Sequence, residues 1–329
     1  MITVTKTENL HDLRDAWQRL YQNNATLSYY QSFEYVETLM RHIAPYRLIL
    51  RGKPVFFQFE NDGTIVLILP LFKLKRGTYV LLGQKAGLGY LDAVYADGMD
   101  ARTFDLCFSA LADRFGVRHI HFEHVREETT LAAWLLQNGG SYSETACTAI
   151  PLPAEYALYV NSLGKHIKQN IRTAYNRLAT DEGSYTFEHK SYRELSPACA
   201  RELQSLYLKR QRARYGKGLL YRLFVKYVDV GTKIQTAPTV RVQAFILRIN
   251  GRVAAYFDAI CHEGGVIVPR LAINDGFARY SPGVMLLNES IRALIDAGVG
   301  QIDLTHGSEP YKIAMGGIQH RCVEADINR

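Results

Sequence analysis

Two polar stretches toward the C-terminal end of the chain carry residue types that can support chemistry. The first is F-A-R-Y-S-P-G at residues 277–283, where a Ser-Pro pair is typical of a helix start. The first N–H groups of a helix have no intrahelical partner and attract anions. We therefore expect Arg279, Ser281 and the backbone N–H groups of Gly283 and Val284 to bind phosphate oxygens. A purely structural helix start is the alternative interpretation.

The second stretch is H-G-S-E-P-Y-K at residues 306–312, and it combines an imidazole, a carboxylate, a phenol and an amine. Proton transfer by positioned side chains of these types is general acid–base chemistry. Glu309 or His306 is the candidate base, directly or through water, and Tyr311 is the candidate acid. Lys312 is expected to bind phosphate or to stabilise an oxyanion. A solvent-exposed last helix is the alternative interpretation.

The surrounding pattern predicts a βαβ unit that brings the two stretches together. Residues 265–273 form a β-branched apolar run, and residues 301–305 form a second one. Between them, apolar residues recur at helical spacing from 284 to 297, and a glycine at 298 ends the pattern. In a right-handed βαβ unit, the end of the second strand lies near the helix start.

Two further residues belong to this candidate site. We expect Pro269 and Arg270 to mark a bend in the first strand that exposes backbone N–H groups. Arg270 would then lie near the same phosphate-bearing ligand. Asp258 follows the small residues of A-A-Y-F-D-A and would face the same cleft if strand alternation points it inward. A hydrogen-bonded structural carboxylate is an equally supported interpretation of Asp258.

The sequence F-A-R-Y-S-P-G, a helix and then I-D-L-T-H-G-S-E-P-Y-K resembles the cellulose-biosynthesis (CelD-like) branch of the GNAT acyltransferase superfamily. More distantly, it is similar to Fem-type aminoacyl transferases of peptidoglycan bridges. The usual GNAT acyl-CoA loop reads Gln/Arg-x-x-Gly-x-Gly/Ala. Arg279 fits its first position, whereas Pro282 and Val284 replace both small residues.

The resemblance implies an α/β fold of two tandem GNAT-like domains, at residues 1–153 and 154–329. Each would be a central, mostly antiparallel sheet flanked by helices. It also implies an N-acyltransferase that uses acetyl-CoA or another acyl-CoA and no metal. The implied acceptor is an amine on an amino sugar or on a precursor of a cell-envelope polysaccharide. A Fem-like aminoacyl-tRNA-dependent transferase and a non-catalytic polyanion-binding accessory protein remain alternatives.

The composition is that of an ordinary globular protein and limits the possible classes. The chain has 329 residues, of which 47% are hydrophobic and 22% charged. The five scattered cysteines indicate neither a zinc site nor a disulfide framework, and they favour a reducing cytoplasm. The first residues contain no apolar signal core, and the longest apolar run is far too short to span a bilayer.

The positive charge is concentrated in one segment. Thirteen basic and five acidic residues lie between Lys165 and Arg222, whereas the rest of the chain has 26 basic and 27 acidic residues. The densest part is L-K-R-Q-R-A-R-Y-G-K-G at 208–218. Such a field attracts polyanions, including CoA phosphates or tRNA, although a solvated helix face is the simpler interpretation.

Periodicity and turn residues predict similar elements in both halves. One strand carries His119, His121 and Glu123 on one face, a pattern that would suit a metal, but the sequence shows no second cluster to complete a site. The expected helices span residues 10–21, 32–43, 100–115, 128–137, 155–163, 165–180, 197–214 and 219–230. The expected strands span residues 46–50, 55–59, 64–72, 79–82, 117–122, 144–152, 185–189, 239–249 and 252–261.

Overall fold

The computed structural model describes the chain except residues 50, 75–77, 85–88, 140–141, 216–236 and 238. The helix expected at residues 219–230 therefore lies outside the described part. The chain divides into two compact units, which we treat separately. Unit 1 contains Met1–Ala146 and His320–Arg329, and unit 2 contains Cys147–Gln319. The last ten residues, which the sequence places with the second domain, thus lie in unit 1.

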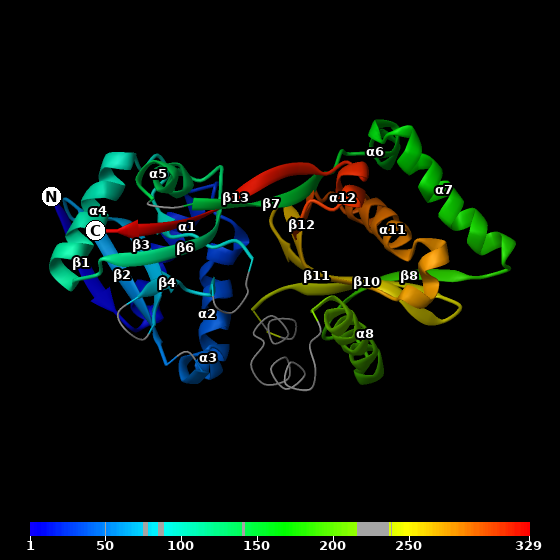
Figure 1. Ribbon diagram of the computed structural model, residues 1–329, viewed down its shortest axis with the longest axis horizontal. Helices are drawn as coiled ribbons and strands as arrows, with labels where there is room; N and C mark the ends of the chain where they lie inside the picture. The colour runs from blue at the N-terminus through cyan, green and yellow to red at the C-terminus, as the bar shows by residue number, and fades with distance from the viewer. Residues whose placement is uncertain (50, 75–77, 85–88, 140–141, 216–236, 238) are drawn as a thin grey trace. The chain divides into compact units, whose positions relative to one another are not determined.

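Unit 1 is a mixed sheet flanked by helices (Figure 1). Its strands follow the order β1-β2-β3-β4-β6-β13, and β5 pairs with β3. The β4–β6 pair is parallel, whereas the pairs β1–β2, β2–β3, β3–β4, β3–β5 and β6–β13 are antiparallel. The strands are β1 (Ile2–Thr7), β2 (Lys53–Asn61), β3 (Thr64–Lys73), β4 (Tyr79–Leu81), β5 (Val94–Tyr95), β6 (His119–Arg126) and β13 (Ile318–Asn328). The helices are α1 (Arg14–Gln22), α2 (Phe33–His42), α3 (Ala44–Ile49), α4 (Ala101–Phe115) and α5 (Thr130–Asn138).

The strand expected at residues 46–50 is wrong, because α3 occupies Ala44–Ile49. A proline fits the first turn of a helix, where its missing N–H group would have no partner, so Pro45 does not prevent this helix. The core of unit 1 is rich in aromatic side chains. Trp17 is fully buried there, and its indole N–H donates to the carbonyl of Gln31 at 2.8 Å. Phe108 and Trp134 stack with centroids 4.5 Å apart.

Unit 2 also has a sheet between helices, with strand order β7-β12-β11-β10-β9-β8 (Figure 1). The β11–β12 pair is parallel and its neighbours are antiparallel. The strands are β7 (Tyr142–Pro151), which begins in unit 1, β8 (Tyr185–Ser191), β9 (Val242–Ile249), β10 (Arg252–His262), β11 (Gly265–Ile273) and β12 (Gln301–His306). The helices are α6 (Tyr156–Ser162), α7 (Lys165–Thr180), α8 (Pro197–Tyr215), α11 (Pro282–Asp296) and α12 (Pro310–Ala314), and a 3-10 helix, η5 (Asp275–Tyr280), precedes α11.

Helices cover both faces of the unit 2 sheet. Helices α6, α7 and α11 pack on one face, and α11 buries Leu287, Ile291 and Leu294 there. Helix α8 packs on the other face, where Leu203 and Leu206 meet Ile246. Each fully buried side chain of this size contributes about 1.5–3 kcal/mol through removal from water. Both units therefore have the predicted arrangement of a sheet with flanking helices, and β11, α11 and β12 form the expected βαβ unit.

The expected hairpin turn at Asn250-Gly251 is confirmed. It joins β9 to β10, and both turn residues have positive φ, 48° and 76°. Two consecutive positive φ angles are the mark of the turn type that best matches strand twist. The turn sets the register of β10, which in turn positions β11.

Gly251→Ala should lower the free energy of unfolding by about 1 kcal/mol, because a Cβ atom disfavours the left-handed φ of 76°. Gly300→Ala is the matched control, since a Cβ atom there would meet only the Gly264 carbonyl at an ordinary 3.4 Å. Urea unfolding of both variants measures the difference. Equal stability of the two variants would contradict the turn assignment.

Candidate functional site

The parallel strands β11 and β12 pair only near their beginnings. The register joins Val266 to Ile302 and Ile267 to Asp303, and no further pair is recorded for the described strands. On its other side, β11 contains a bulge, because Val268 and Pro269 together face one residue of β10. Pro269 has no N–H group to donate to the neighbouring strand. The bend expected at Pro269 is thus present, and it lies where the two parallel strands cease to pair.

The end of β12 is held by local hydrogen bonds. Asp303 accepts from the backbone N–H of Thr305 at 2.7 Å, and the Thr305 hydroxyl donates to the carbonyl of Val268 at 3.3 Å. Thr305 itself has a φ of 54°, which is unusual for a β-branched residue. Asp303 therefore braces the end of the strand.

Lys312 anchors the turn that follows β12. Its ammonium group donates to the carbonyls of Leu304 at 3.1 Å, His306 at 2.8 Å and Gly307 at 3.5 Å. It also lies 3.0 Å from Glu309 Oε2. A buried ammonium needs such partners, because removal from water is otherwise costly. This geometry gives Lys312 a positioning role, and its contact with donor phosphate stays a prediction.

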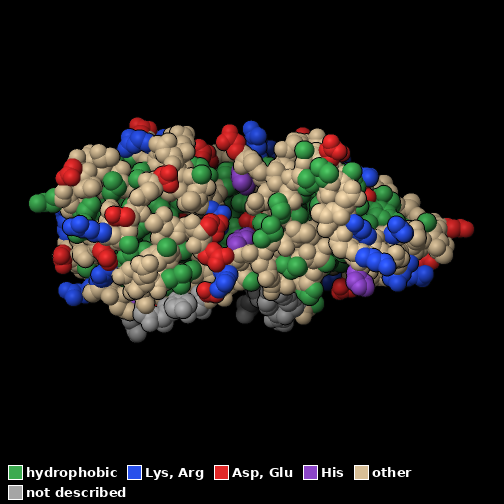
Figure 2. Space-filling view, turned by 90° about the horizontal axis from the view of Figure 1, so that it is seen from above, with side chains coloured by type: hydrophobic (Ala, Val, Ile, Leu, Met, Phe, Trp, Pro, Cys, Tyr) green, Lys and Arg blue, Asp and Glu red, His purple; other side chains and the backbone are tan. Residues whose placement is uncertain are grey.

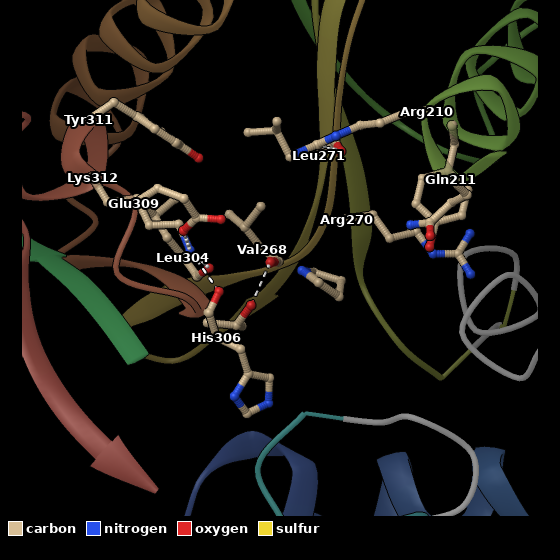
Figure 3. Close-up of a pocket in the computed structure, with 13 residues that line it drawn as sticks. Arg210, Gln211, Val268, Arg270, Leu271, Leu304, His306, Glu309, Tyr311 and Lys312 are labelled. Carbon is tan, nitrogen blue, oxygen red and sulfur yellow. Dashed lines mark hydrogen bonds and ion pairs between the residues drawn. The ribbon is translucent and has the colours of Figure 1, made fainter. Parts of the chain in front are cut away.

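A pocket of about 150 Å³ opens between these elements (Figure 3). Five residues of the predicted site line it, namely Arg270, His306, Glu309, Tyr311 and Lys312. Such a volume has room for the reacting groups of a small substrate. The other lining residues are Tyr207, Arg210, Gln211, Val268, Pro269, Leu271, Leu304 and Thr305.

The pocket has an acidic and phenolic wall facing a basic one. Figure 3 shows Glu309 and Tyr311 on one side and Arg210 and Arg270 on the other. The guanidinium of Arg270 lies 4.7 Å from the ring centroid of Tyr207, a cation–π contact, and Arg270 is only 7% exposed. Arg210 donates to the backbone carbonyl of Leu271. Because guanidinium groups stay charged, this wall favours anionic atoms.

The imidazole of His306 has a different neighbour. Its ring points away from Glu309 and Tyr311 in Figure 3, and its Nδ1 lies 3.3 Å from the thiol sulfur of Cys147 on β7. His306 thus lines the pocket while its ring contacts a buried cysteine. Of the two candidate bases, Glu309 is the better placed, since its side chain is 37% exposed.

Asp258 is fully buried and is not among the pocket-lining residues described here. Tyr192 donates its hydroxyl to Asp258 Oδ1 at 2.5 Å. Burial and the neighbouring Asp258 charge raise the pKa of Tyr192 well above its usual value, so the phenol stays protonated. Asp258 is also the register partner of Arg270 across β10 and β11. This placement fits the interpretation of Asp258 as a hydrogen-bonded structural carboxylate. It also puts Asp258 beside Arg270, which belongs to the basic wall of the pocket.

The predicted phosphate-binding residues form a separate group at the start of α11. Arg279 pairs with Asp181 at 2.8 Å, and its side chain is 65% exposed. Ser281 is the N-cap residue with a φ of 49°, but its side chain makes no capping hydrogen bond. The N–H group of Val284 already donates to the Ser281 carbonyl at 2.9 Å. At Gly283, a Cβ atom would lie 2.7 Å from Ile273 Cδ1, so a larger residue there would need the tip of the Ile273 side chain to shift.

Helix α8 contributes lining residues that the sequence did not assign to the site. Tyr207, Arg210 and Gln211 reach the pocket from this helix, which packs on β11. The only sequence signal was the basic stretch at 208–218, which predicted a charged surface. Periodicity does not show that a helix about 60 residues earlier in the sequence packs against β11. The sequence therefore did not predict that α8 lines the pocket.

Comparison with known proteins identifies the domain in unit 2. Residues 165–313 match the family model of an acetyltransferase (GNAT) domain. A search of curated proteins found no match. Residues 165–313 are therefore similar to a GNAT acetyltransferase domain, and the chain is an acyltransferase.

Solved structures share the fold over nearly the whole chain. FemX has a TM-score of 0.60 at 10% identity, with 99% of this chain and 97% of that chain covered. A tandem GNAT protein from the clavulanic acid biosynthesis pathway has a TM-score of 0.55 at 11% identity, with 100% and 98% covered. A GNAT-family acetyltransferase from Colwellia psychrerythraea has a TM-score of 0.51 at 10% identity, with 99% and 100% covered. At these identities the likeness establishes the fold alone.

Within the described part of the chain, no helix has both the length and the apolar character needed to cross a membrane.

Lys312→Met should lower the free energy of unfolding by at least about 2 kcal/mol, because three carbonyls lose their charged donor. Lys209→Met, at an exposed position on α8, is the control and should change stability little. Urea unfolding with a probe in unit 2 makes the comparison. If Lys312→Met were as stable as the control, Lys312 would not anchor the turn.

Proposed function

We propose that the unit 2 pocket transfers an acyl group from acetyl-CoA or another acyl-CoA to an amine. The observation that carries the proposal is that Arg270, Glu309 and Tyr311 line one pocket beside the bulged strand β11. The amine attacks the thioester carbonyl directly, the carbon–sulfur bond breaks, and the amine loses a proton. We propose no covalent acyl-enzyme, because the described residues that line the pocket do not combine a nucleophile with a base and a group that orients it.

Glu309 is the proposed base and Tyr311 the proposed acid. The Glu309 carboxylate, which lies 3.0 Å from the Lys312 ammonium, would accept a proton through water or directly. Tyr311 would donate its proton to the departing thiolate. The charge that develops on the carbonyl oxygen would be stabilised by the basic wall, which contains Arg210 and Arg270. His306 remains a secondary candidate for the base.

The donor's phosphates would bind at the start of α11, through Arg279, Ser281 and the N–H group of Gly283. Arg279 must then exchange its partner Asp181 for phosphate. An exposed ion pair of this kind contributes only about 0–1 kcal/mol, so a multiply charged phosphate can replace it. The arrangement separates the recognition of the donor's charged end from the chemistry in the pocket.

The proposed acceptor is an amino sugar or another amine of a cell-envelope polysaccharide precursor. The resemblance of residues 277–283 and 302–312 to the CelD-like branch supports this choice, and a polar pocket suits a hydroxyl-rich acceptor. None of the five cysteines forms a disulfide, which fits a reducing cytoplasm as the place of reaction.

An aminoacyl-tRNA donor is the second candidate, and one observation favours it. Helix α7 exposes Lys165, Arg172 and Arg177, and Figure 2 shows basic side chains gathered over this part of unit 2. A basic surface of this kind binds the phosphate backbone of nucleic acids. If neither donor binds, this surface would instead support a non-catalytic polyanion-binding protein.

Acetyl-CoA should raise the melting temperature, because a ligand that binds only the folded state stabilises it by ~2.7 kcal/mol at 100 times its Kd. Arg279→Ala should reduce this rise strongly, whereas Arg201→Ala on the exposed face of α8 should leave it unchanged. The thermal shift is measured at low and moderate salt. A salt-sensitive shift with tRNA and none with acetyl-CoA would favour the aminoacyl donor.

Glu309→Gln should lower kcat by ~10²–10⁴-fold with little change in the Kd for acetyl-CoA, because it removes the proton acceptor but keeps the side-chain shape. The assay follows thiol release with glucosamine as the amine. Glu263→Gln, in the β10–β11 turn, is the control. An unchanged kcat in Glu309→Gln would remove Glu309 from the chemistry.

A further inference from the structure

A histidine and several carboxylates gather on one face of the unit 1 sheet, apart from the acyl-transfer pocket. They come from β6 and from β13, the last strand of the chain, which pair antiparallel. His121 is the register partner of Asp326, and His119 is the partner of Asn328. The sequence alone showed only the β6 half of this group, because the two strands are about 200 residues apart.

A β-bulge brings two carboxylates side by side in this group. The register shifts between Val323 and Ala325, so that Glu123 and His124 of β6 together face Glu324 of β13. His124 adopts a φ of 61°, in the left-handed region that residues other than glycine rarely occupy. Bulges of this kind re-aim side chains and often occur beside functional sites.

The donor atoms have the spacing of ligands that share one ion. His121 Nε2 lies 3.0 Å from Glu123 Oε1 and 3.5 Å from Glu324 Oε1. The three donor atoms all lie within 4.8 Å of one another. With metal–ligand bonds of about 2.0–2.2 Å, adjacent ligand atoms lie roughly 3.0–3.5 Å apart. One ion can therefore contact all three side chains after only small movements.

The imidazole is oriented as in many metal sites. Its second nitrogen, Nδ1, lies 3.0 Å from Asp326 Oδ1. When Nδ1–H donates to this carboxylate, Nε2 keeps its lone pair and points it toward Glu123 and Glu324. Metal-binding histidines commonly donate their other N–H to a carboxylate, which fixes the tautomer and makes the ligand more basic.

We propose that His121, Glu123 and Glu324 bind one divalent transition-metal ion, with Asp326 as the residue that positions the imidazole. One imidazole and two carboxylates suit zinc, manganese or cobalt(II) better than soft, thiolate-preferring ions. All three side chains are half-buried, with exposures of 22%, 22% and 41%. The ion would be accessible from solvent and would retain water in its remaining positions.

The ion would tie the C-terminal strand into unit 1. Glu324 lies on β13 and the other two ligands lie on β6, so the ion links distant parts of the chain. An ion that binds only the folded state would stabilise the pairing of β6 with β13 by mass action. A metal-free alternative exists, in which a protonated His121 bridges the carboxylates, and the experiment must distinguish the two.

Cobalt(II) binding to the chelator-treated full chain tests the proposal, followed by visible absorption and by calorimetry. We expect one ion per chain with a spectrum of nitrogen and oxygen ligands, and a higher melting temperature. His121→Gln should weaken binding at least ~100-fold and Asp326→Asn about 10-fold, as loss of a ligand and loss of its orienting partner predict. His189→Gln, another strand histidine, is the control and should bind like the wild type.

Equal cobalt(II) affinity in wild type and His121→Gln would overturn the proposal, and so would no binding by the wild type at millimolar metal. An intense thiolate-to-cobalt band that His121→Gln leaves unchanged would also overturn it. That band would place the ion on Cys147, which lies 3.3 Å from His306. If circular dichroism shows that His121→Gln is unfolded, Glu324→Gln, near the chain end, serves as the ligand variant with the same expected loss.

Discussion

The ammonium group of Lys312 is the interaction on which the geometry of the unit 2 pocket depends. It is buried at the end of β12 and holds the carbonyls of Leu304, His306 and Gly307 in one place. Charged hydrogen bonds of this kind contribute about 1.5–3 kcal/mol each, and a buried carbonyl left without a donor is costly. The turn that carries Glu309 and Tyr311 therefore has a fixed geometry before any substrate binds, which is what positioning by an enzyme requires.

The second constraint is the separation of β11 from β12. A proline at the bulge of β11 cannot donate to β10, and the parallel pairing with β12 is recorded only at two positions. The pocket forms where these strands part, and α8 closes it with Tyr207 and Arg210. The βαβ connection through α11 places residues 279–284 at a different point of the same domain. In the proposed function, the two groups of residues therefore have different tasks, chemistry in the pocket and donor recognition at the start of α11.

The sequence predicted those elements whose signals are local. The span of α7 agrees with its apolar stripe, and the Asn250-Gly251 turn followed from turn chemistry. The sequence also placed residues 306–312 at a strand end, and four of them, His306, Glu309, Tyr311 and Lys312, line the pocket. Long-range pairing left no such signal. Strand β13 carries many charged residues and was not predicted, and β1 was missed although I-T-V-T-K-T alternates. For the same reason, the sequence did not predict that Tyr207, Arg210 and Gln211 of α8 line the pocket, or that Glu324 lies beside His121.

The most direct test of the account is hydrogen–deuterium exchange of the full chain with and without acetyl-CoA. The account predicts slower exchange at residues 304–315 and 281–287, since the donor would contact the pocket turn and the start of α11 together. Both segments belong to unit 2, so the slower exchange should be confined to unit 2. Protection confined to α7, or no protection at saturating acetyl-CoA, would contradict the assignment of the pocket to acyl transfer.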